Sequence, residues 1–136
     1  MSKIEWQDEF SVHNEDIDRQ HQKWLAIYNK MHVTMMEGDN DALDSLGQKA
    51  LDEMEDYAQK HFAFEEDYMQ QLGYTELSAH QLLHKNFYTM LNKFRQDMTD
   101  GEIVLNSHII KTVKNWLLSH ILVEDQKYAL FADRKK

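Results

Sequence analysis

Apolar side chains recur every three or four residues in four separate stretches of the chain, which is the spacing of one face of an α-helix. The four helices are expected to cover about residues 14–37, 41–71, 75–99 and 102–128. No stretch alternates apolar and polar residues over a useful length, so we expect no β-sheet. The chain also contains no proline, which favours long uninterrupted helices.

Polar residues and glycines mark the expected ends of these helices. Asn14 or Asp16 can cap the start of the first helix, and Thr75 or Ser78 can cap the third. Gly73 stands where a glycine commonly ends a helix, and we expect it to end the second. The connections between helices are therefore short.

Long helices joined by short turns pack most simply as an antiparallel up-down-up-down four-helix bundle. We therefore predict an all-α fold, with a bundle over about residues 14–128 and an extended N-terminal arm over about 1–13. The 136 residues suit one domain, 1–136. We find neither a run of about eighteen apolar residues, as a membrane span requires, nor a secretory signal.

Charge and composition exclude several classes of function. The formal net charge is -9 without a compensating basic stripe, so we expect neither nucleic acid nor a membrane as a partner. The chain has no cysteine, which excludes disulfides, thiolate metal sites and thiol catalysis. This composition fits a reducing compartment, and we expect a cytoplasmic protein.

Five of the eight histidines fall on the apolar faces of the expected helices: His21, His61, His80, His84 and His120. A lone histidine on such a face is more often a hydrogen-bonded core residue than a metal ligand. Five imidazoles bring ten ring nitrogens, however, and the same faces offer few hydrogen-bond partners. A metal ion takes one nitrogen from each ring, so the pattern favours a metal site.

Two pairs of potential ligands are separated by four residues. His61 and Glu65 form one pair, and His80 and His84 form the other. Four residues make about one helical turn, so both side chains of a pair point to the same side of their helix. Each pair can therefore contribute to a single site.

His120 and Asp125 make a third pair, with a different spacing. Five residues correspond to about 140° around a regular α-helix, which is too far for both side chains to reach one site. We therefore predict that the helix loosens or ends between Ile121 and Asp125.

Five imidazoles and the carboxylates of Glu65 and Asp125 are too many ligands for one ion. Ligation by nitrogen and oxygen without sulfur suits iron or manganese better than structural zinc. If both carboxylates and a solvent-derived oxygen bridge two ions, each ion has three shared ligands. Three histidines then make one ion six-coordinate, and the remaining two make the other five-coordinate. A reduced di-iron pair with one open position is suited to O2.

These residues resemble the seven-ligand signature of the hemerythrins, most closely that of the bacterial branch, the bacteriohemerythrins. The matching motifs are His21, His61-x3-Glu65, His80-x3-His84 and His120-x4-Asp125. The resemblance extends from about Ile4 to Tyr128. Outside the ligands it includes Trp6, Ser11-Val12, Ile17-Asp18-x2-His21 and Trp116-Leu117-x2-His120-Ile121.

The resemblance implies two iron ions, alternating between Fe2+ and Fe3+. The coordinatively saturated iron would be held by His80, His84 and His120. The iron that takes O2 would be held by His21 and His61. The two carboxylates named above would bridge the ions together with an oxo or hydroxo group.

The family lines its O2 pocket with apolar side chains, which here correspond to Trp24, Phe62, Trp116, Leu117 and Ile121. Ordinary core packing is the alternative role for all five, and for Trp116 neither role is favoured. Trp24 follows His21 by one turn, where the family usually has an aliphatic residue, and would narrow the pocket. His13 stands where many relatives have glycine. We expect His13, His32 and His108 to be surface loop residues.

The ligand set favours binding over oxidation. Ferritin-like di-iron enzymes use about four carboxylates and two histidines, whereas here histidines outnumber carboxylates. The leading hypothesis is therefore reversible O2 binding, for storage, delivery or sensing, by a protein that is not an enzyme. Two alternatives stay open. One is a di-iron oxidase, peroxidase or nitric oxide reductase; the other is a regulatory module that senses O2, nitric oxide or another small ligand.

Overall fold

Helices make up most of the part of the chain that the structure describes. This computed structural model describes residues 3–135, except the side chains of residues 40–42, and contains no strand within that range. Its elements are η1 (Asp8–Phe10, a 3-10 turn), α1 (Glu15–Glu37), α2 (Asn40–Leu72), α3 (Leu77–Thr99), α4 (Ser107–Ser119), η2 (His120–Glu124, a π-helical turn) and α5 (Asp125–Arg134).

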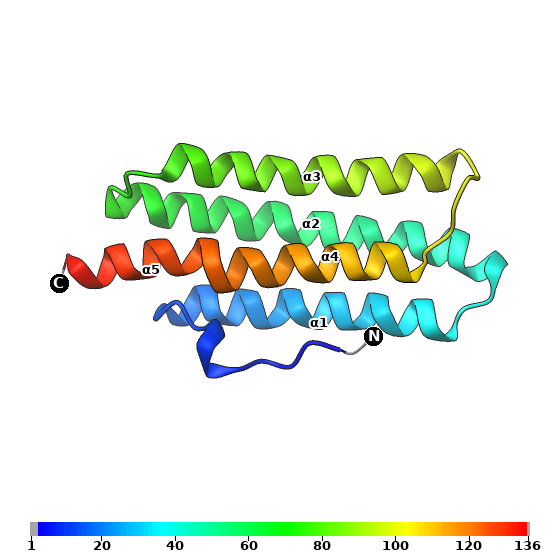
Figure 1. Ribbon diagram of the computed structural model, residues 1–136, viewed down its shortest axis with the longest axis horizontal. Helices are drawn as coiled ribbons and strands as arrows, with labels where there is room; N and C mark the ends of the chain where they lie inside the picture. The colour runs from blue at the N-terminus through cyan, green and yellow to red at the C-terminus, as the bar shows by residue number, and fades with distance from the viewer. Residues whose placement is uncertain (1–2, 136) are drawn as a thin grey trace.

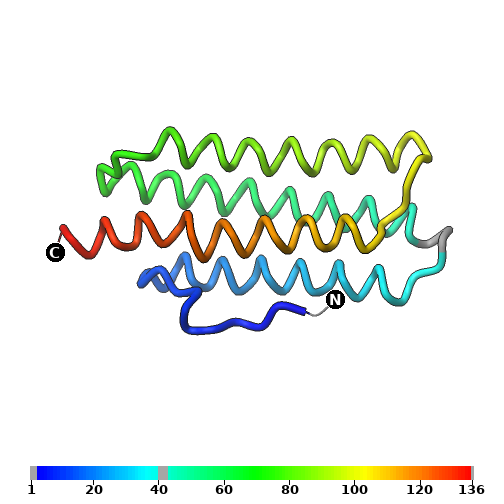
Figure 2. The backbone as a smooth tube through the Cα atoms, in the orientation of Figure 1, coloured from blue at the N-terminus to red at the C-terminus, as the bar shows by residue number. Residues whose placement is uncertain are grey.

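The helices of residues 3–135 form four rods. These rods lie side by side and alternate in direction, as Figures 1 and 2 show. The first three are α1, α2 and α3, while α4, η2 and α5 follow one another without interruption as the fourth rod. The predicted up-down-up-down four-helix bundle is therefore confirmed. No helix in residues 3–135 is long and apolar enough to cross a membrane.

The apolar faces of the four rods bury two hydrophobic clusters. The larger cluster follows most of the bundle and includes Trp24, Phe62 and Ile121. The smaller cluster includes Ile17 and Tyr128 and lies near the start of α1, the end of α2 and α5. Buried polar side chains that lie between the two clusters therefore form a layer with an apolar region on either side.

Two of the expected helix ends are confirmed. The Asn14 side chain accepts a hydrogen bond from the N–H of Ile17 at 3.1 Å and caps α1. Gly73 has a φ of +71°, a left-handed conformation that glycine adopts without steric cost. Its N–H donates to Gln70 O, and the next N–H, of Tyr74, donates to Met69 O. These two bonds form a Schellman motif that ends α2.

The third helix begins near the expected position, but its predicted N-cap residues were wrong. Neither Thr75 nor Ser78 is the N-cap: Glu76 occupies that position and makes no side-chain capping bond, and α3 begins at Leu77. The turn after Gly73 extends through residue 76, so Thr75 lies before the cap and Ser78 already lies within the helix.

The fourth helix also begins later than expected, at Ser107 rather than near residue 102. Asn106 is its N-cap and accepts a hydrogen bond from the N–H of Ile109 at 3.0 Å. The preceding segment stays non-helical and buries Leu105 against α2. Gly47 makes room for this contact, because a Cβ there would lie 2.8 Å from Leu105 Cβ.

The described part of the N-terminal arm runs back along α1 (Figure 1). Side chains of that helix hold it. The amide of Asn29 bonds both the N–H and the carbonyl of Ile4, each at 2.8 Å. Nearer the turn into α1, Asp18 accepts hydrogen bonds from the Ser11 hydroxyl at 2.6 Å and the Val12 N–H at 2.9 Å. The arm is therefore an ordered part of the bundle.

The three histidines expected at the surface behave differently from one another. His13 is exposed, and its φ of +60° lies in the left-handed region that favours glycine. His108 is exposed too, but in the first turn of α4 rather than in a loop. The prediction for His32 was wrong: this residue lies on α1 one turn after Tyr28 and is 7% exposed, with no hydrogen-bond partner at either ring nitrogen.

Candidate metal centre

All seven residues of the predicted ligand set meet in the layer between the two apolar clusters. α1 contributes His21, α2 contributes His61 and Glu65, and α3 contributes His80 and His84. The fourth rod contributes the last two, His120 at the start of η2 and Asp125 at the start of α5. Each of the seven is at most 3% exposed.

The π-helical turn η2 brings His120 and Asp125 to the same side of the fourth rod. The N–H of Asp125 donates to the carbonyl of His120, a bond that spans five residues instead of the four of an α-helix. The Nε2 of His120 consequently lies 3.1 Å from Oδ1 of Asp125. The Gln126 amide donates to the carbonyls of Ile121 and Ser11 and so ties this turn to the arm. The predicted loosening of the helix is confirmed.

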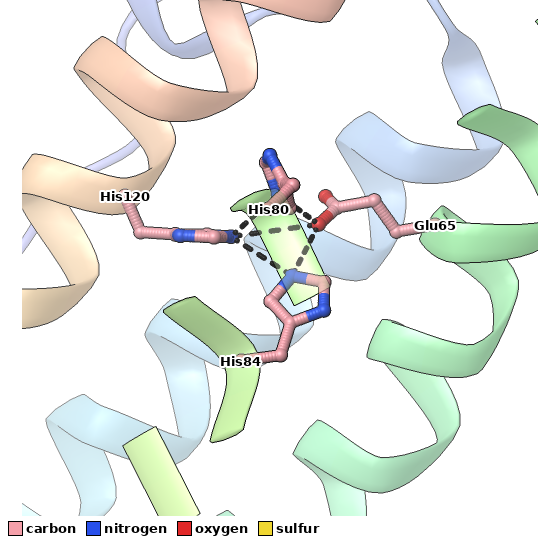
Figure 3. Close-up of side chains that lie close together, drawn as sticks. All are labelled: Glu65, His80, His84 and His120. Carbon is pink, nitrogen blue, oxygen red and sulfur yellow. Dashed lines mark hydrogen bonds and ion pairs between the residues drawn. The ribbon is translucent and has the colours of Figure 1, made fainter. Parts of the chain in front are cut away.

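Three imidazoles converge on one oxygen of Glu65, as Figure 3 shows. Oε1 of Glu65 lies 3.0 Å from Nε2 of His80, 2.9 Å from that of His84 and 3.4 Å from that of His120. The Nε2 of His120 is also 3.2 Å from the Nε2 of each of the other two rings. Oδ1 of Asp125 completes this three-His group, 3.1 Å from His80 Nε2.

Two imidazoles face the other oxygen of the same carboxylate. Oε2 of Glu65 lies 3.6 Å from Nε2 of His21 and 3.4 Å from Nε2 of His61. Oδ2 of Asp125 lies 3.1 Å from Nε2 of His21. Each carboxylate therefore presents one oxygen to the three-His group and the other to this two-His group.

Burial and mutual attraction shift the protonation of these groups in opposite directions. Burial lowers the pKa of His21, but the negative carboxylates of Asp125 and Glu65, 3.1 Å and 3.6 Å from its Nε2, outweigh burial and raise the pKa to about 9. The pKa of His80 is raised to about 9 in the same way. Burial lowers the pKa of His61. Burial raises the pKa of the Glu65 carboxyl, but the surrounding imidazoles hold it well below its usual range. The layer thus favours positive charge between two ionised carboxylates.

Several buried polar atoms that face this layer have no hydrogen-bond partner among the residues that the structure describes. They include Nε2 of His21, Nε2 of His61 and both oxygens of Asp125. Buried polar atoms are almost always satisfied, so these lone pairs indicate a missing electrophile. Metal–nitrogen distances of about 2.0–2.1 Å place ligands at right angles about 3 Å apart, which is close to the separations found here. The donor set fits two metal ions, one at each group.

Aromatic rings cover the two groups on the side of the larger cluster. Trp24 is completely buried, with its ring centroid 5.1 Å from that of His61 and 6.5 Å from that of His21. Phe62 stacks on His84 at 3.7 Å, and its ring lies 5.4 Å from that of Trp24. Trp24 therefore lies against the two-His group, and Phe62 lies against the three-His group with its ring 5.8 Å from that of His61.

The other three residues assigned to the pocket lie on the fourth rod. Leu117 and Ile121 are completely buried in the larger cluster. Trp116 is only half-buried and stacks on His120 at 4.6 Å, which places it against the three-His group. Its ring still approaches that of Trp24, at 6.1 Å.

Three further residues support the ligands and were not identified from the sequence. The Tyr128 hydroxyl is buried and donates to Oε2 of Glu65 at 2.9 Å. Gln20 Oε1 lies 2.8 Å from Nδ1 of His61. Glu66 Oε2 lies 2.6 Å from Nδ1 of His84. Tyr128 follows Asp125 by one turn, a spacing that marks it as a neighbour. Gln20 and Glu66 directly adjoin ligands in the sequence, so helical spacing does not distinguish them.

Comparison with known proteins agrees with this geometry. The hemerythrin HHE cation binding domain matches residues 12–132. The bacteriohemerythrin of Stenotrophomonas maltophilia is 31% identical over 129 residues, which cover 95% of this chain and 81% of that protein. The bacteriohemerythrin of Clostridium acetobutylicum is 30% identical over 127 residues, covering 90% and 96%.

Solved structures show the same likeness in three dimensions. A crystal structure of wild-type hemerythrin superimposes with a TM-score of 0.85 at 29% identity and covers 96% of this chain and 98% of that one. A leucine-to-alanine mutant of hemerythrin gives the same TM-score at 28% identity and covers 97% of this chain and 98% of that one. The matched residues include every member of the two clustered groups, and the chain belongs to the hemerythrin family.

Proposed function

We propose that the chain binds O2 reversibly at two iron ions held by the seven clustered side chains. The observation that carries this proposal is the unequal division of the imidazoles, three facing one oxygen of Glu65 and two facing the other. Two ferrous ions, one with an open position, bind O2 and release it again, and this is the chemistry that iron would supply here.

Each ligand would have a definite role. His80, His84 and His120 would complete the coordination of one iron, while His21 and His61 would leave a position open on the other. The two carboxylates would bridge the irons, because each presents one oxygen to each group. An oxo or hydroxo group would be the third bridge.

The apolar residues beside the two-His group would keep water away from the open position. We assign this role to Trp24, Phe62, Leu117 and Ile121, all at most 2% exposed. We include Trp116 because its ring approaches that of Trp24. By excluding water, these side chains would favour reversible binding of O2 over irreversible oxidation of the iron.

Two features favour binding over enzymatic turnover. Five imidazoles against two carboxylates is the reverse of the balance in ferritin-like oxidising centres. In addition, the indole N–H of Trp24 donates to Sδ of Met54 at 2.9 Å, so it is not offered as a proton donor to the two-His group. The side that faces the open position is consequently apolar.

The proposal extends to location and role. A chain without cysteine suits a reducing cytoplasm, where oxidised iron would be returned to the ferrous state. Storage, delivery and sensing all rest on the same reversible binding. A regulatory module would in addition require a protein partner that responds to the ligand.

The test measures iron and O2 on the same sample. We expect two irons per chain, and a visible absorption band that appears when the anaerobically reduced protein meets air and disappears under argon. One zinc per chain, or no iron after growth in iron-rich medium, would refute the di-iron assignment. Continuous O2 consumption in the presence of a reductant, without a reversible band, would instead support a di-iron enzyme.

A further inference from the structure

In each group, one imidazole has a side-chain oxygen within hydrogen-bond distance of its Nδ1, and the two oxygens differ in charge. In the two-His group, Nδ1 of His61 lies 2.8 Å from Oε1 of Gln20, a neutral amide. In the three-His group, Nδ1 of His84 lies 2.6 Å from Oε2 of Glu66, a carboxylate. Both rings turn Nε2 toward Glu65. When Nε2 binds a metal, Nδ1 carries the hydrogen and donates it to these oxygens.

Further hydrogen bonds hold Glu66 through its side chain and Gln20 through its backbone. The other oxygen of Glu66 accepts a hydrogen bond from the Gln81 amide at 3.1 Å, and its side chain is 29% exposed. The backbone carbonyl of Gln20 accepts a hydrogen bond from the Tyr57 hydroxyl at 3.0 Å. Gln20 also borders a surface hollow lined by Asp16, Arg19 and Lys23, so a carboxylate at position 20 would find water and charges of both signs.

The charge of the oxygen beside Nδ1 changes what the imidazole gives to a metal. A carboxylate accepts a stronger, shorter hydrogen bond than an amide and draws the Nδ1 hydrogen toward itself. The ring then carries more negative charge and becomes a more basic ligand, which favours the higher oxidation state of the ion. By this argument the three-His group stabilises Fe3+ more than the two-His group does.

We propose that Glu66 and Gln20 tune the two irons of the centre to unequal reduction potentials. This inference rests on the di-iron site of the proposed function and concerns how that site is tuned. Glu66 acts through His84 to lower the potential of the saturated iron. Gln20, being neutral, would leave the iron at His61 with the higher potential, so that Fe2+ is favoured more at this iron than at the saturated one. Neither side chain touches a metal ion, and both are positioning residues.

The experiment exchanges the two charges without changing shape. Glu66→Gln and Gln20→Glu are nearly isosteric, and the double variant keeps the net charge of the parent. Each two-iron protein is titrated on an electrode at one pH, and each step is the loss of one electron from Fe2+ to give Fe3+, with the electron passing to the electrode. Gln22→Glu adds the same charge on the exposed face of α1 and serves as the control.

We expect Glu66→Gln to raise the lower of the two potentials and Gln20→Glu to lower the higher one. Changes in residues that hydrogen-bond to metal ligands typically alter metal affinity or activity about 10-fold to 100-fold. A 10-fold change in the equilibrium constant of a one-electron step corresponds to about 59 mV. The double variant should exchange the order in which the two irons are oxidised. Gln22→Glu should leave both potentials where they are in the parent.

Unchanged potentials in both single variants would overturn the inference, because a role limited to orienting the rings survives an isosteric exchange that keeps the hydrogen bond. If Glu66→Gln loses iron, Gln20→Glu decides alone, and loss of iron from both would also overturn it. A parent that holds two irons but never binds O2 reversibly would refute the proposed function, while its potentials would still test this inference.

Discussion

Replacing Trp24 by alanine tests whether this side chain keeps water away from the two-His group. The Trp24 ring is completely buried and lies 5.1 Å from His61 and 6.5 Å from His21. Its removal should leave a cavity beside the proposed open position and admit water there. We therefore expect the air-oxidised protein to accumulate faster in Trp24→Ala than in the parent.

The stability lost can be worked from the burial of the ring. A buried aromatic side chain removes about 150–250 Å² from water, which at about 25 cal/mol per Å² amounts to about 4–6 kcal/mol. Measured truncations of core aromatics give about 3–5 kcal/mol. The hydrogen bond to Met54 is lost as well. Because domains of this size are stable by about 5–15 kcal/mol, denaturant unfolding should show a large loss in a protein that still folds.

The assay follows oxidation after reduction without oxygen. Parent and variant are reduced, exposed to air and followed through the decay of the visible band of the oxygenated protein. Trp6→Ala is the matched control, since it removes the same side chain from the arm, where it packs on Phe10 at 5.5 Å. An unchanged decay rate in Trp24→Ala with both irons present would refute the reasoning, because it would show that Trp24 does not shield the two-His group.

Three further predictions concern the metal centre as a whole. His80→Ala should lose both irons together in metal analysis, because the bridging carboxylates couple the two ions. Tyr128→Phe should lower the free energy of unfolding of the metal-free protein by about 1–3 kcal/mol in urea, since Oε2 of Glu65 loses its buried donor. The folded-state pKa of both His21 and His80 is about 9, above the ordinary 6.5. The contribution of these two histidines to the stability of the metal-free protein should therefore be fully present below about pH 6.5 and be lost as the pH rises through about 9, as thermal melts across this range would show.

Each of these predictions has its own control. His108→Ala changes an exposed histidine and should keep both irons; loss of only one iron from His80→Ala would contradict the coupling. Tyr74→Phe removes a neighbouring hydroxyl, and an equal loss of stability there would discount the bond to Glu65. For the pH series, iron-loaded protein should melt higher than metal-free protein and vary less with pH, and identical curves would show that the ligands are not a strained buried cluster.

The sequence alone determined the helices and the seven clustered residues. Apolar positions three and four residues apart place a continuous stripe on each helix, and four such stripes have one simple way to be buried together. A histidine or carboxylate that interrupts a stripe is carried into the core with it. For this reason His61 and Glu65, one turn apart, could be assigned to one site before any coordinates. The five-residue step from His120 to Asp125 also revealed the loosened turn η2, because a regular helix would separate them.

Other features depended on tertiary packing. The start of α4 at Ser107 follows from the burial of Leu105 against α2, where Gly47 leaves room for it. His32 lies within α1 and is buried, although its polar side chain suggested the surface. Local capping residues and polarity are weak guides at these positions, because contacts with segments distant in the sequence outweigh them.

The sequence therefore determined which residues form the candidate site, and the tertiary structure decided how they are supported. Gln20 and Glu66 directly adjoin ligands, so they lie off the apolar stripes and look like ordinary polar surface positions. Only the packing of α1 against α2, and of α2 against α3, brings Gln20 to His61 and Glu66 to His84. Helical periodicity reports which side of its own helix a residue occupies, whereas a hydrogen bond between helices depends on their relative rotation and height. Those two quantities are set by the interlocking of all the buried side chains together.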